Sequence, residues 1–345
     1  MFSLAGLLLD RTTKFVVLFV FVATIVISMA NQIGPERNWF FSFLQYIPYY
    51  FFIAPALGAF ALSFMASLRW KLMAIASFVL VLTALMGLEI NKGDVGTARL
   101  RVMTYNVKDY VALDGAAGLV DIAREVALHD PDILALQDAG LLNEKWDTER
   151  EKLAILFGNR HVYTFGQYAV ASRYPLRGCR PGYISYRNRT HTYVHCVVLT
   201  PHMQIDLYTA HLLTPRVGLN AVRQERLSGI VDWQQNVDDR MTQADSLAKD
   251  LYRSIRPVIL VGDLNAPESS LVVRRLLRTG LKDAFSTAGF GYGYTYGHSL
   301  KFGISFLRID HILVSQSFGV EKCFVGGKLA SPHRPVIADV LLQPQ

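Results

Sequence analysis

The sequence predicts an α/β protein, with two packed sheets covered by helices, preceded by a membrane anchor of three helices. Three long stretches without a charged residue fall within residues 1–90, whereas the rest of the 345-residue chain has the mixed composition of a globular domain. In that later part, strand patterns alternate with helix patterns and several strands end on a polar residue, as expected for layers built round one core. We therefore expect an anchor over 1–90, a linker over 91–97 and one large domain over 98–345.

Three transmembrane helices are expected over about residues 15–30, 46–68 and 72–88, which contain no Asp, Glu, Lys, Arg or His. About 20 apolar residues span the hydrocarbon core, and about 17 is the short limit. The second stretch exceeds this length, and the other two lie near the limit. Pro48 and Pro55 could kink the second helix without preventing a span. Because no span carries an acidic or basic side chain, the helices predict an anchor rather than a transport path.

Basic residues predict the orientation of this anchor. Arg11 and Lys14 precede the first stretch, and Arg69 and Lys71 lie between the second and the third. The positive-inside rule places both groups in the cytoplasm. Three crossings of the cell (inner) membrane then leave the large domain outside the cytoplasm. A cleaved signal peptide ending at Ser28-Met-Ala30 is the alternative for the first stretch, and it would leave the domain outside as well.

Net charge and cysteines limit the possible partners and compartments. The formal charge of +7 favours an anionic substrate or an anionic membrane surface, and it does not by itself indicate nucleic acid. Cys179, Cys196 and Cys323 fit no zinc-site spacing. A disulfide between Cys179 and Cys196 is one expectation, and buried free thiols are the other.

The elements of the large domain follow from local patterns. Polar and apolar residues alternate over 99–106, and apolar runs at 133–136 and 258–261 indicate buried strands. Apolar residues at helical spacing indicate a helix over 118–129. Gly alternates with Phe and Tyr over 289–297, which predicts a loop or an edge strand. In order, the expected elements are strand 99–106, helix 118–129, strand 133–136, helix 144–157, strands 168–172, 191–201 and 203–210, two helices within 220–256, strand 258–261, helix 269–278, strand 308–314 and strand 336–342.

The strand at 258–261 leads into the most informative stretch of the chain. Gly262 and Pro267 punctuate it, and Asp263 and Asn265 lie two residues apart. Side chains two apart on an extended chain point the same way, so a carboxylate and a carboxamide would project together from a strand end. Taken alone, an Asx turn explains the same residues.

Seven short motifs occur in one order across the large domain. They are Thr104-Tyr-Asn-Val107, Pro131-Asp-Ile-Leu-Ala-Leu-Gln-Asp138, Ser172-Arg-Tyr-Pro175, Ala210-His-Leu212, Val261-Gly-Asp-Leu-Asn265, Arg308-Ile-Asp-His311 and His333-Arg-Pro-Val336. In order and spacing they resemble the endonuclease/exonuclease/phosphatase (DNase I-like) superfamily, and the resemblance covers residues 98–345. It implies a four-layered α/β/β/α sandwich and cleavage of phosphate esters with Mg²⁺ or Mn²⁺.

The resemblance also implies a metal site. Asp138 would be the main metal ligand, and Asn106 would complete or support the site. Mg²⁺ prefers carboxylate and carbonyl oxygens and keeps several waters, so one or two protein ligands suffice. Asp263 would orient or deprotonate the attacking water, unless His333 takes the proton.

The remaining motif residues would contact the phosphate. By the same resemblance, Asn265 and His211 would donate hydrogen bonds to it, and Arg173 would be a further substrate-binding residue. His333, held by Asp310, would contact the phosphate or act as an acid or base.

Two positions depart from the family pattern. Asp138 stands where the family usually has Glu, so a metal would have to sit closer or bind through water. Pro332 stands where many members have an Asp that acts as an auxiliary metal ligand, and proline cannot replace it. These departures favour one metal ion over two.

Together these features predict a membrane-anchored, divalent-metal-dependent phosphoesterase. It would hydrolyse phosphate ester or diphosphate bonds outside the cytoplasm, with a lipid-linked substrate at the bilayer as one expectation. A membrane-tethered nuclease is an alternative, because arginines and tyrosines over 177–189 could form a basic groove with stacking rings. A catalytically degenerate binding module is the third hypothesis. The substrate, the number of metals, the retention of activity and the oligomeric state stay open at the level of sequence.

Overall fold

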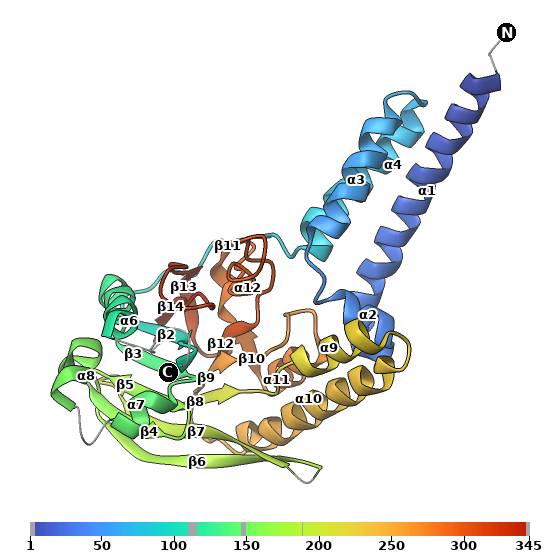
Figure 1. Ribbon diagram of the computed structural model, residues 1–345. Coiled ribbons are helices and arrows are strands. Elements are labelled where there is room, and N and C mark those ends of the chain that lie inside the picture. Colours follow the sequence, from blue (N-terminus) through green and yellow to red (C-terminus); the bar gives the residue numbers. More distant parts are fainter. Residues whose placement is uncertain (1–3, 110–115, 146–149, 188, 343–345) are drawn as a thin grey trace. The chain divides into compact units, whose positions relative to one another are not determined.

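The computed structural model describes residues 4–109, 116–145, 150–187 and 189–342. The chain divides into two compact units, Met1–Glu89 and Ile90–Gln345. The first unit is helical, and the second contains two sheets with helices (Figure 1). Their boundary falls within the short strand β1 (Glu89–Ile90).

The helices of the first unit pack on one another. α1 (Leu4–Ile33) contacts α3 (Tyr50–Ser63) and α4 (Leu68–Leu80), and the π-helical turn η2 (Val81–Leu85) extends α4. The short elements η1 (Pro35–Arg37) and α2 (Trp39–Leu44) lie between α1 and α3 in the chain. Among the described residues, two helices are long and apolar enough to cross a membrane, and they cover Leu7–Ile33 and Leu68–Leu85.

The expected three transmembrane helices are not confirmed. Residues 46–68 do not form one helix, because α3 begins at Tyr50, after Pro48, and ends at Ser63. Its 14 residues rise about 21 Å, which is short of the roughly 30 Å hydrocarbon core of a bilayer. The first apolar helix is longer than expected and includes Arg11 and Lys14 near its start.

The second unit contains two six-stranded sheets. The first sheet has the order β13-β14-β2-β3-β5-β4 and the second the order β10-β12-β9-β8-β7-β6. The strands of the first are β2 (Arg99–Asn106), β3 (Ile133–Gln137), β4 (His161–Phe165), β5 (Tyr168–Ser172), β13 (Gly319–Val325) and β14 (Val336–Leu341). Those of the second are β6 (Leu176–Tyr186), β7 (Arg189–Leu199), β8 (Gln204–His211), β9 (Val258–Asp263), β10 (Leu281–Asp283) and β12 (Asp310–Ser315).

Helices cover the outer faces of both sheets. One buried cluster lies between the sheets and includes Val102 and Ile133 from one and Leu207 and Ile259 from the other. A second cluster joins the first sheet to α6 (Ala116–His129), α7 (Gly140–Lys145) and α8 (Arg150–Phe157). A third joins the other sheet to α10 (Gly229–Tyr252) and α11 (Leu271–Leu277). The remaining elements are α9 (Arg216–Glu225), α12 (Ala284–Ala288) and β11 (Phe290–Gly291). The expected α/β sandwich of two packed sheets is therefore confirmed.

Strand direction places the polar strand ends together. β2 and β3 are parallel, with Asn106 opposite Gln137, and β8 and β9 are parallel, with His211 opposite Asp263. β12 runs antiparallel to β9 and begins with Asp310 opposite Asp263. Because parallel strands finish at the same edge of a sheet, these side chains gather at one edge of the sandwich.

The strands missed by the sequence patterns are edge strands. β4 and β13 close the two sides of the first sheet, and β6 closes one side of the second. Within β6, Pro181 and Gly182 weaken the strand pattern, and an edge strand tolerates them because one row of its backbone groups needs no partner strand. The single helix expected over 144–157 is instead α7 and α8, with residues 146–149 outside the described part.

A disulfide joins Cys179 of β6 to Cys196 of β7. It lies where the register between the two strands shifts. Cys323 is a buried free thiol, and burial raises its pKa well above the usual value. Of the two expectations for the cysteines, the structure therefore has the Cys179–Cys196 bond.

A buried ionic network holds the start of β12. Arg308 Nη1 donates to both carboxylate oxygens of Asp283 at 2.9 and 3.0 Å, and Arg308 Nη2 donates to Glu268. His311 Nδ1 lies 2.9 Å from Asp283 Oδ2. Burial raises the pKa of Asp283, but Arg308 and His311 outweigh it and hold that pKa well below its usual range. The resulting stability is present above about pH 4 and is lost as the pH falls through the lower folded pKa.

We predict that Arg308→Met weakens the second unit strongly, because it leaves the buried Asp283 carboxylate without its guanidinium partner. The free energy of unfolding should fall by about 3–5 kcal/mol in chemical denaturation of the full chain in detergent. The matched control is Arg253→Met, which removes an exposed arginine paired with Asp250 at 3.2 Å and should cost less than about 1 kcal/mol. Equal losses in the two variants would show that the network does not support β12.

Candidate active site

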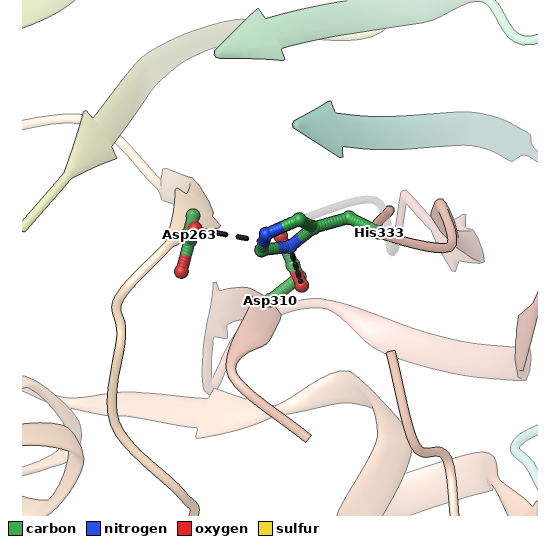
Figure 2. A group of neighbouring side chains, drawn as sticks. All are labelled: Asp263, Asp310 and His333. Carbon is green, nitrogen blue, oxygen red and sulfur yellow. Dashed lines mark hydrogen bonds and ion pairs between the residues drawn. The ribbon is translucent and has the colours of Figure 1, made fainter. Parts of the chain in front are cut away.

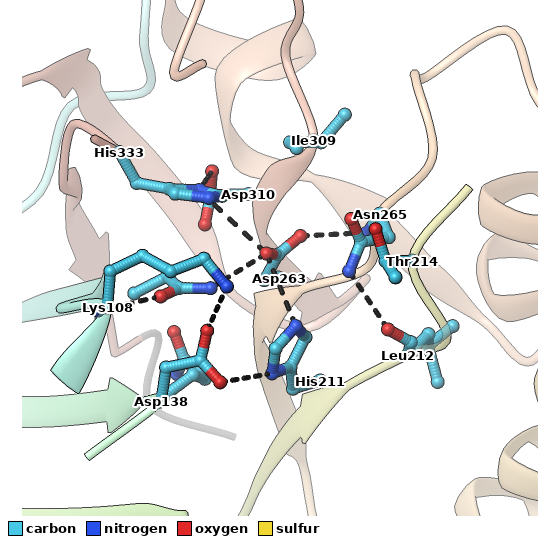
Figure 3. Close-up of polar contacts among 12 residues, drawn as sticks. Lys108, Asp138, His211, Leu212, Thr214, Asp263, Asn265, Ile309, Asp310 and His333 are labelled. Atoms are coloured by element: carbon cyan, nitrogen blue, oxygen red, sulfur yellow. Dashed lines mark hydrogen bonds and ion pairs between the residues drawn. The ribbon is translucent and has the colours of Figure 1, made fainter. Parts of the chain in front are cut away.

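Six strand ends bring polar side chains to one edge of the sandwich (Figure 3). Four lie at or just after the ends of β2, β3, β8 and β9, and two lie at or just before the starts of β12 and β14. The side chains are those of Asn106, Asp138, His211, Asp263, Asp310 and His333. A cleft of about 240 Å³ opens beside them, and Lys108, His211, Asp263 and His333 are among the residues that line it.

The end of β9 is fixed by close backbone packing. Gly262 has φ 140°, and a Cβ there would lie 1.9 Å from the carbonyl oxygen of Ala210 on β8, so only glycine fits. Next to it, Asp263 is 1% exposed. Asp263 Oδ1 accepts from the Asn265 backbone N–H at 2.9 Å, and Asp263 Oδ2 accepts from Asn106 Nδ2 at 2.9 Å. Both oxygens of this carboxylate are therefore held in place, one of them from the other sheet.

His333 and Asp310 form a buried pair behind Asp263 (Figure 2). His333 Nδ1 lies 3.0 Å from Asp310 Oδ2 and 3.8 Å from Asp263 Oδ2. Burial lowers the pKa of His333, but Asp310 and Asp263 outweigh it and raise that pKa above 6.5. The stability from this pair is present below about pH 6.5 and is lost as the pH rises through the folded pKa. Burial and the neighbouring Asp310 raise the pKa of Asp263.

His211 lies between two carboxylates. Its Nε2 is 3.6 Å from Asp263 Oδ2, and its Nδ1 is 3.4 Å from Asp138 Oδ1 and 2.7 Å from Gln167 Oε1. The backbone N–H of His211 donates to the hydroxyl of the buried Tyr168 at 3.0 Å. This ring is thus oriented from both sheets.

Asp138 already interacts with two basic side chains. Lys108 Nζ donates to Asp138 Oδ2, and His211 lies near the other oxygen. Burial raises the pKa of Asp138, but His211 and Lys108 outweigh it and hold that pKa below its usual value. Asn106 Oδ1 accepts from the Lys108 backbone N–H at 3.1 Å. The two predicted metal ligands, Asp138 and Asn106, therefore both interact with Lys108.

Three residues of this edge have left-handed backbone conformations. The φ angles are 49° for Lys108, 47° for Asp138 and 50° for Asn265. Such a conformation costs an L-residue roughly 1–2 kcal/mol, although Asn tolerates it better than most. Strained backbone of this kind persists where the surrounding structure fixes it, and it gathers at functional sites.

The carboxylates of Asp263 and Asp310 fit a divalent cation. Among the described residues, Asp263, Asp310 and His333 each offer a donor atom, and these atoms all lie within 4.8 Å of one another. Asp310 Oδ1 is buried and has no hydrogen-bond partner among the described residues, so it is an oxygen that a cation would satisfy. Mg²⁺ and Mn²⁺ favour such oxygens.

The structure does not bring Arg173 to the site, so its expected substrate contact needs correction. Ser172 lies opposite Ile133, the first residue of β3, so Arg173 stands at the end of β5 away from Asp138. Arg173 pairs there with Asp130 and with Asp132 at 3.1 Å. All other predicted site residues converge.

Two residues that the sequence patterns missed lie in the site. Lys108 follows Asn106 by two residues, but it reaches the cleft through a left-handed turn after the end of β2 that the sequence does not signal. Gln167 precedes β5, and we find no signal in the sequence that distinguishes it from a surface residue.

Comparisons with known proteins agree with this geometry. A model of the Endonuclease/Exonuclease/phosphatase family matches residues 103–333. An endonuclease/exonuclease/phosphatase from Beutenbergia cavernae DSM 12333 is 19% identical, with a TM-score of 0.51 over 71% of this chain and 72% of its own. Truncated Caenorhabditis elegans TDP2 is 17% identical, with a TM-score of 0.53 over 70% of this chain and 97% of its own. The Bacteroides thetaiotaomicron VPI-5482 mannosyl-6-phosphatase is 19% identical, with a TM-score of 0.51 over 70% of this chain and 99% of its own. At these identities the solved structures support the fold. A search among curated proteins found no match.

Proposed function

Because the chain belongs to the Endonuclease/Exonuclease/phosphatase family, whose members are metal-dependent phosphoesterases and nucleases, we propose that it hydrolyses a phosphate ester or diphosphate at a membrane surface outside the cytoplasm. The observation that carries the chemistry is the convergence of Asp263, Asp310 and His333 beside the cleft. Five of the residues lining that cleft have cationic or imidazole side chains, namely Lys108, His191, His211, Arg216 and His333. They suit an anionic phosphate.

We assign each group a role that agrees with this geometry. Asp263 lines the cleft, so it is the carboxylate that would orient the attacking water and take its proton. Asp310 and Asp263 raise the pKa of His333, which favours His333 as a donor to the phosphate or to the leaving oxygen rather than as a base. His211 and Asn265 line the same cleft and would donate to the phosphate.

Asp263 and Asp310 would hold a Mg²⁺ or Mn²⁺ ion, whereas Lys108 contacts both Asp138 and Asn106. When bound, such an ion neutralises charge on phosphoryl oxygens and lowers the pKa of a coordinated water. Asn106 then serves as the residue that holds Asp263 through its amide.

A loop beside the site supports a substrate at a membrane surface. Phe290 of β11 is 80% exposed, and between β11 and β12 Phe302 is 63% exposed, with Leu300 and Ile304 also exposed. At the base of this loop the ring of Tyr296 lies 4.8 Å from that of His333. Exposed aromatic and aliphatic side chains of this kind suit the boundary between headgroups and acyl chains.

The disulfide supports the location outside the cytoplasm. Disulfides persist in oxidising compartments and are rare in the cytosol. Cys179–Cys196 lies in the second unit, so an oxidising compartment suits that unit. The two helices long enough to cross a membrane support an anchor, and a complete crossing by α3 would need further apolar length.

The tethered nuclease is less well supported. The arginines expected to form one basic groove do not all lie near the site. Arg177 is opposite Val197, at the end of β7 that is far from the site. Tyr186 is 3% exposed, with its hydroxyl 3.2 Å from His191 Nε2, so its ring is not available to stack on a base. Arg187 is paired with Asp239 at 2.8 Å.

We predict metal-dependent hydrolysis of a lipid-linked phosphate. Purified full chain in vesicles should release phosphate from a polyprenyl diphosphate with Mg²⁺ or Mn²⁺ and lose that activity in EDTA, because the carboxylate pair needs its cation. Sphingomyelin and plasmid DNA are tested in parallel. Cleavage of DNA alone would contradict the lipid assignment, and no turnover of any phosphoester would favour a binding module.

We predict that the second unit lies outside the cytoplasm. A reporter that is active only outside the cytoplasm should be active when fused after Gln345, because the Cys179–Cys196 disulfide of the second unit suits an oxidising compartment. The matched control carries the same reporter after Arg69, where it should be inactive. The reverse pattern of activity would overturn the proposed orientation.

A further inference from the structure

Lys108 is a cation that the backbone turns into the cleft. β2 ends at Asn106, and the Lys108 N–H then donates to Asn106 Oδ1 at 3.1 Å in an Asx-type turn. At Asp109 the backbone N–H donates to the carbonyl oxygen of Asp138 at 2.9 Å, which holds the turn against the end of β3. The left-handed φ of Lys108 follows from these two restraints.

The ammonium group lies at the wall of the cleft. Lys108 Nζ donates to the carboxylate of Asp138, the Lys108 side chain is 28% exposed, and it lines the cleft together with Asp263 and His333. An ammonium has three N–H donors, and the one on Asp138 leaves others for a ligand in the cleft.

Stability alone does not explain this pair. A partly exposed ion pair gains little, because water screens it. Both partners also have strained backbones, with φ 49° at Lys108 and 47° at Asp138. Such strain in two contacting residues is typical of functional sites, where the geometry rather than the stability is required.

The charge requirements of phosphate hydrolysis suggest a function for the ion pair of Lys108 and Asp138. Charge on the phosphoryl oxygens must be neutralised, and two metal ions are one way to do so. Here one cation fits at Asp263 and Asp310, while the carboxylate across the cleft, Asp138, already holds a lysine.

Resting on the proposed function, we propose that Lys108 takes the place of a second metal ion, with its ammonium contacting a non-bridging oxygen of the substrate phosphate. The water oxygen bonds to phosphorus, the water proton goes to Asp263, and the ester or anhydride oxygen leaves with a proton from His333. Lys108 stabilises the charge on the phosphate by hydrogen bonds.

The test compares Lys108→Met with Lys282→Met in the full chain. Lys282 is a matched control, because its ammonium lies 3.9 Å from Asp94 and it does not line the cleft. Turnover is measured with bis(4-nitrophenyl) phosphate at saturating Mg²⁺. Binding of inorganic phosphate without metal and binding of Mn²⁺ are measured by calorimetry, so two of the readouts do not depend on activity.

We expect Lys108→Met to lower kcat by about 100-fold, the usual effect of losing one donor to a developing oxyanion. It should weaken phosphate binding at least about tenfold and tighten Mn²⁺ binding, because Asp138 becomes a free ligand. Lys282→Met should change none of the three.

The outcomes separate this inference from the proposed function. If the wild type turns over the diester and Lys108→Met matches Lys282→Met in all three readouts, the role of Lys108 is overturned. If the wild type is inactive but loses phosphate binding in Lys108→Met, the proposed function fails and the phosphate contact of Lys108 stands.

Discussion

The hydrogen bond from Asn106 Nδ2 to Asp263 Oδ2, 2.9 Å long, joins the two sheets at the edge where the site lies. Asn106 ends a strand of one sheet and Asp263 ends a strand of the other, so the bond fixes the distance between them. The carboxylate that it holds is the one that His211 and His333 both face. A shift of either sheet would break this arrangement, and the buried cluster between the sheets resists such a shift.

Each carboxylate of the site lies beside a basic side chain. Asp138 is offset by Lys108 and His211, and Asp310 is offset by His333. Asp263 is the carboxylate with a raised pKa, and it therefore has the strongest tendency to gain a cation or a proton. This distribution favours Asp263 as the carboxylate that would meet both metal and water. It leaves the basic side chains that line the cleft, such as Lys108 and His211, for the phosphate.

Much of the fold and site could be predicted from the sequence, and the gaps have physical causes. Apolar runs ending in a polar residue indicated β3 and β9. Buried strands need apolar side chains along their length, whereas a strand end at the surface can carry a polar side chain. Edge strands such as β6 have no such run. Motif order alone did not show at which end of β5 Arg173 would lie. The role of Lys108 depends on a left-handed turn that the sequence does not signal, because lysine has no preference for it.

The central claim is that the edge around Asp263 is a hydrolytic site, and the most direct measurement is kcat/KM for a phosphate diester with Mg²⁺ in Asp263→Asn. Asp206→Asn is the matched control. Asp206 is buried like Asp263, but it lies in β8 at the end of the β8–β9 pair that is opposite to Asp263. Losing the group that accepts the water's proton should lower kcat/KM by about 10²–10⁴-fold, while the control retains the wild-type value. Wild-type activity in Asp263→Asn would contradict the assignment of this edge as the active site.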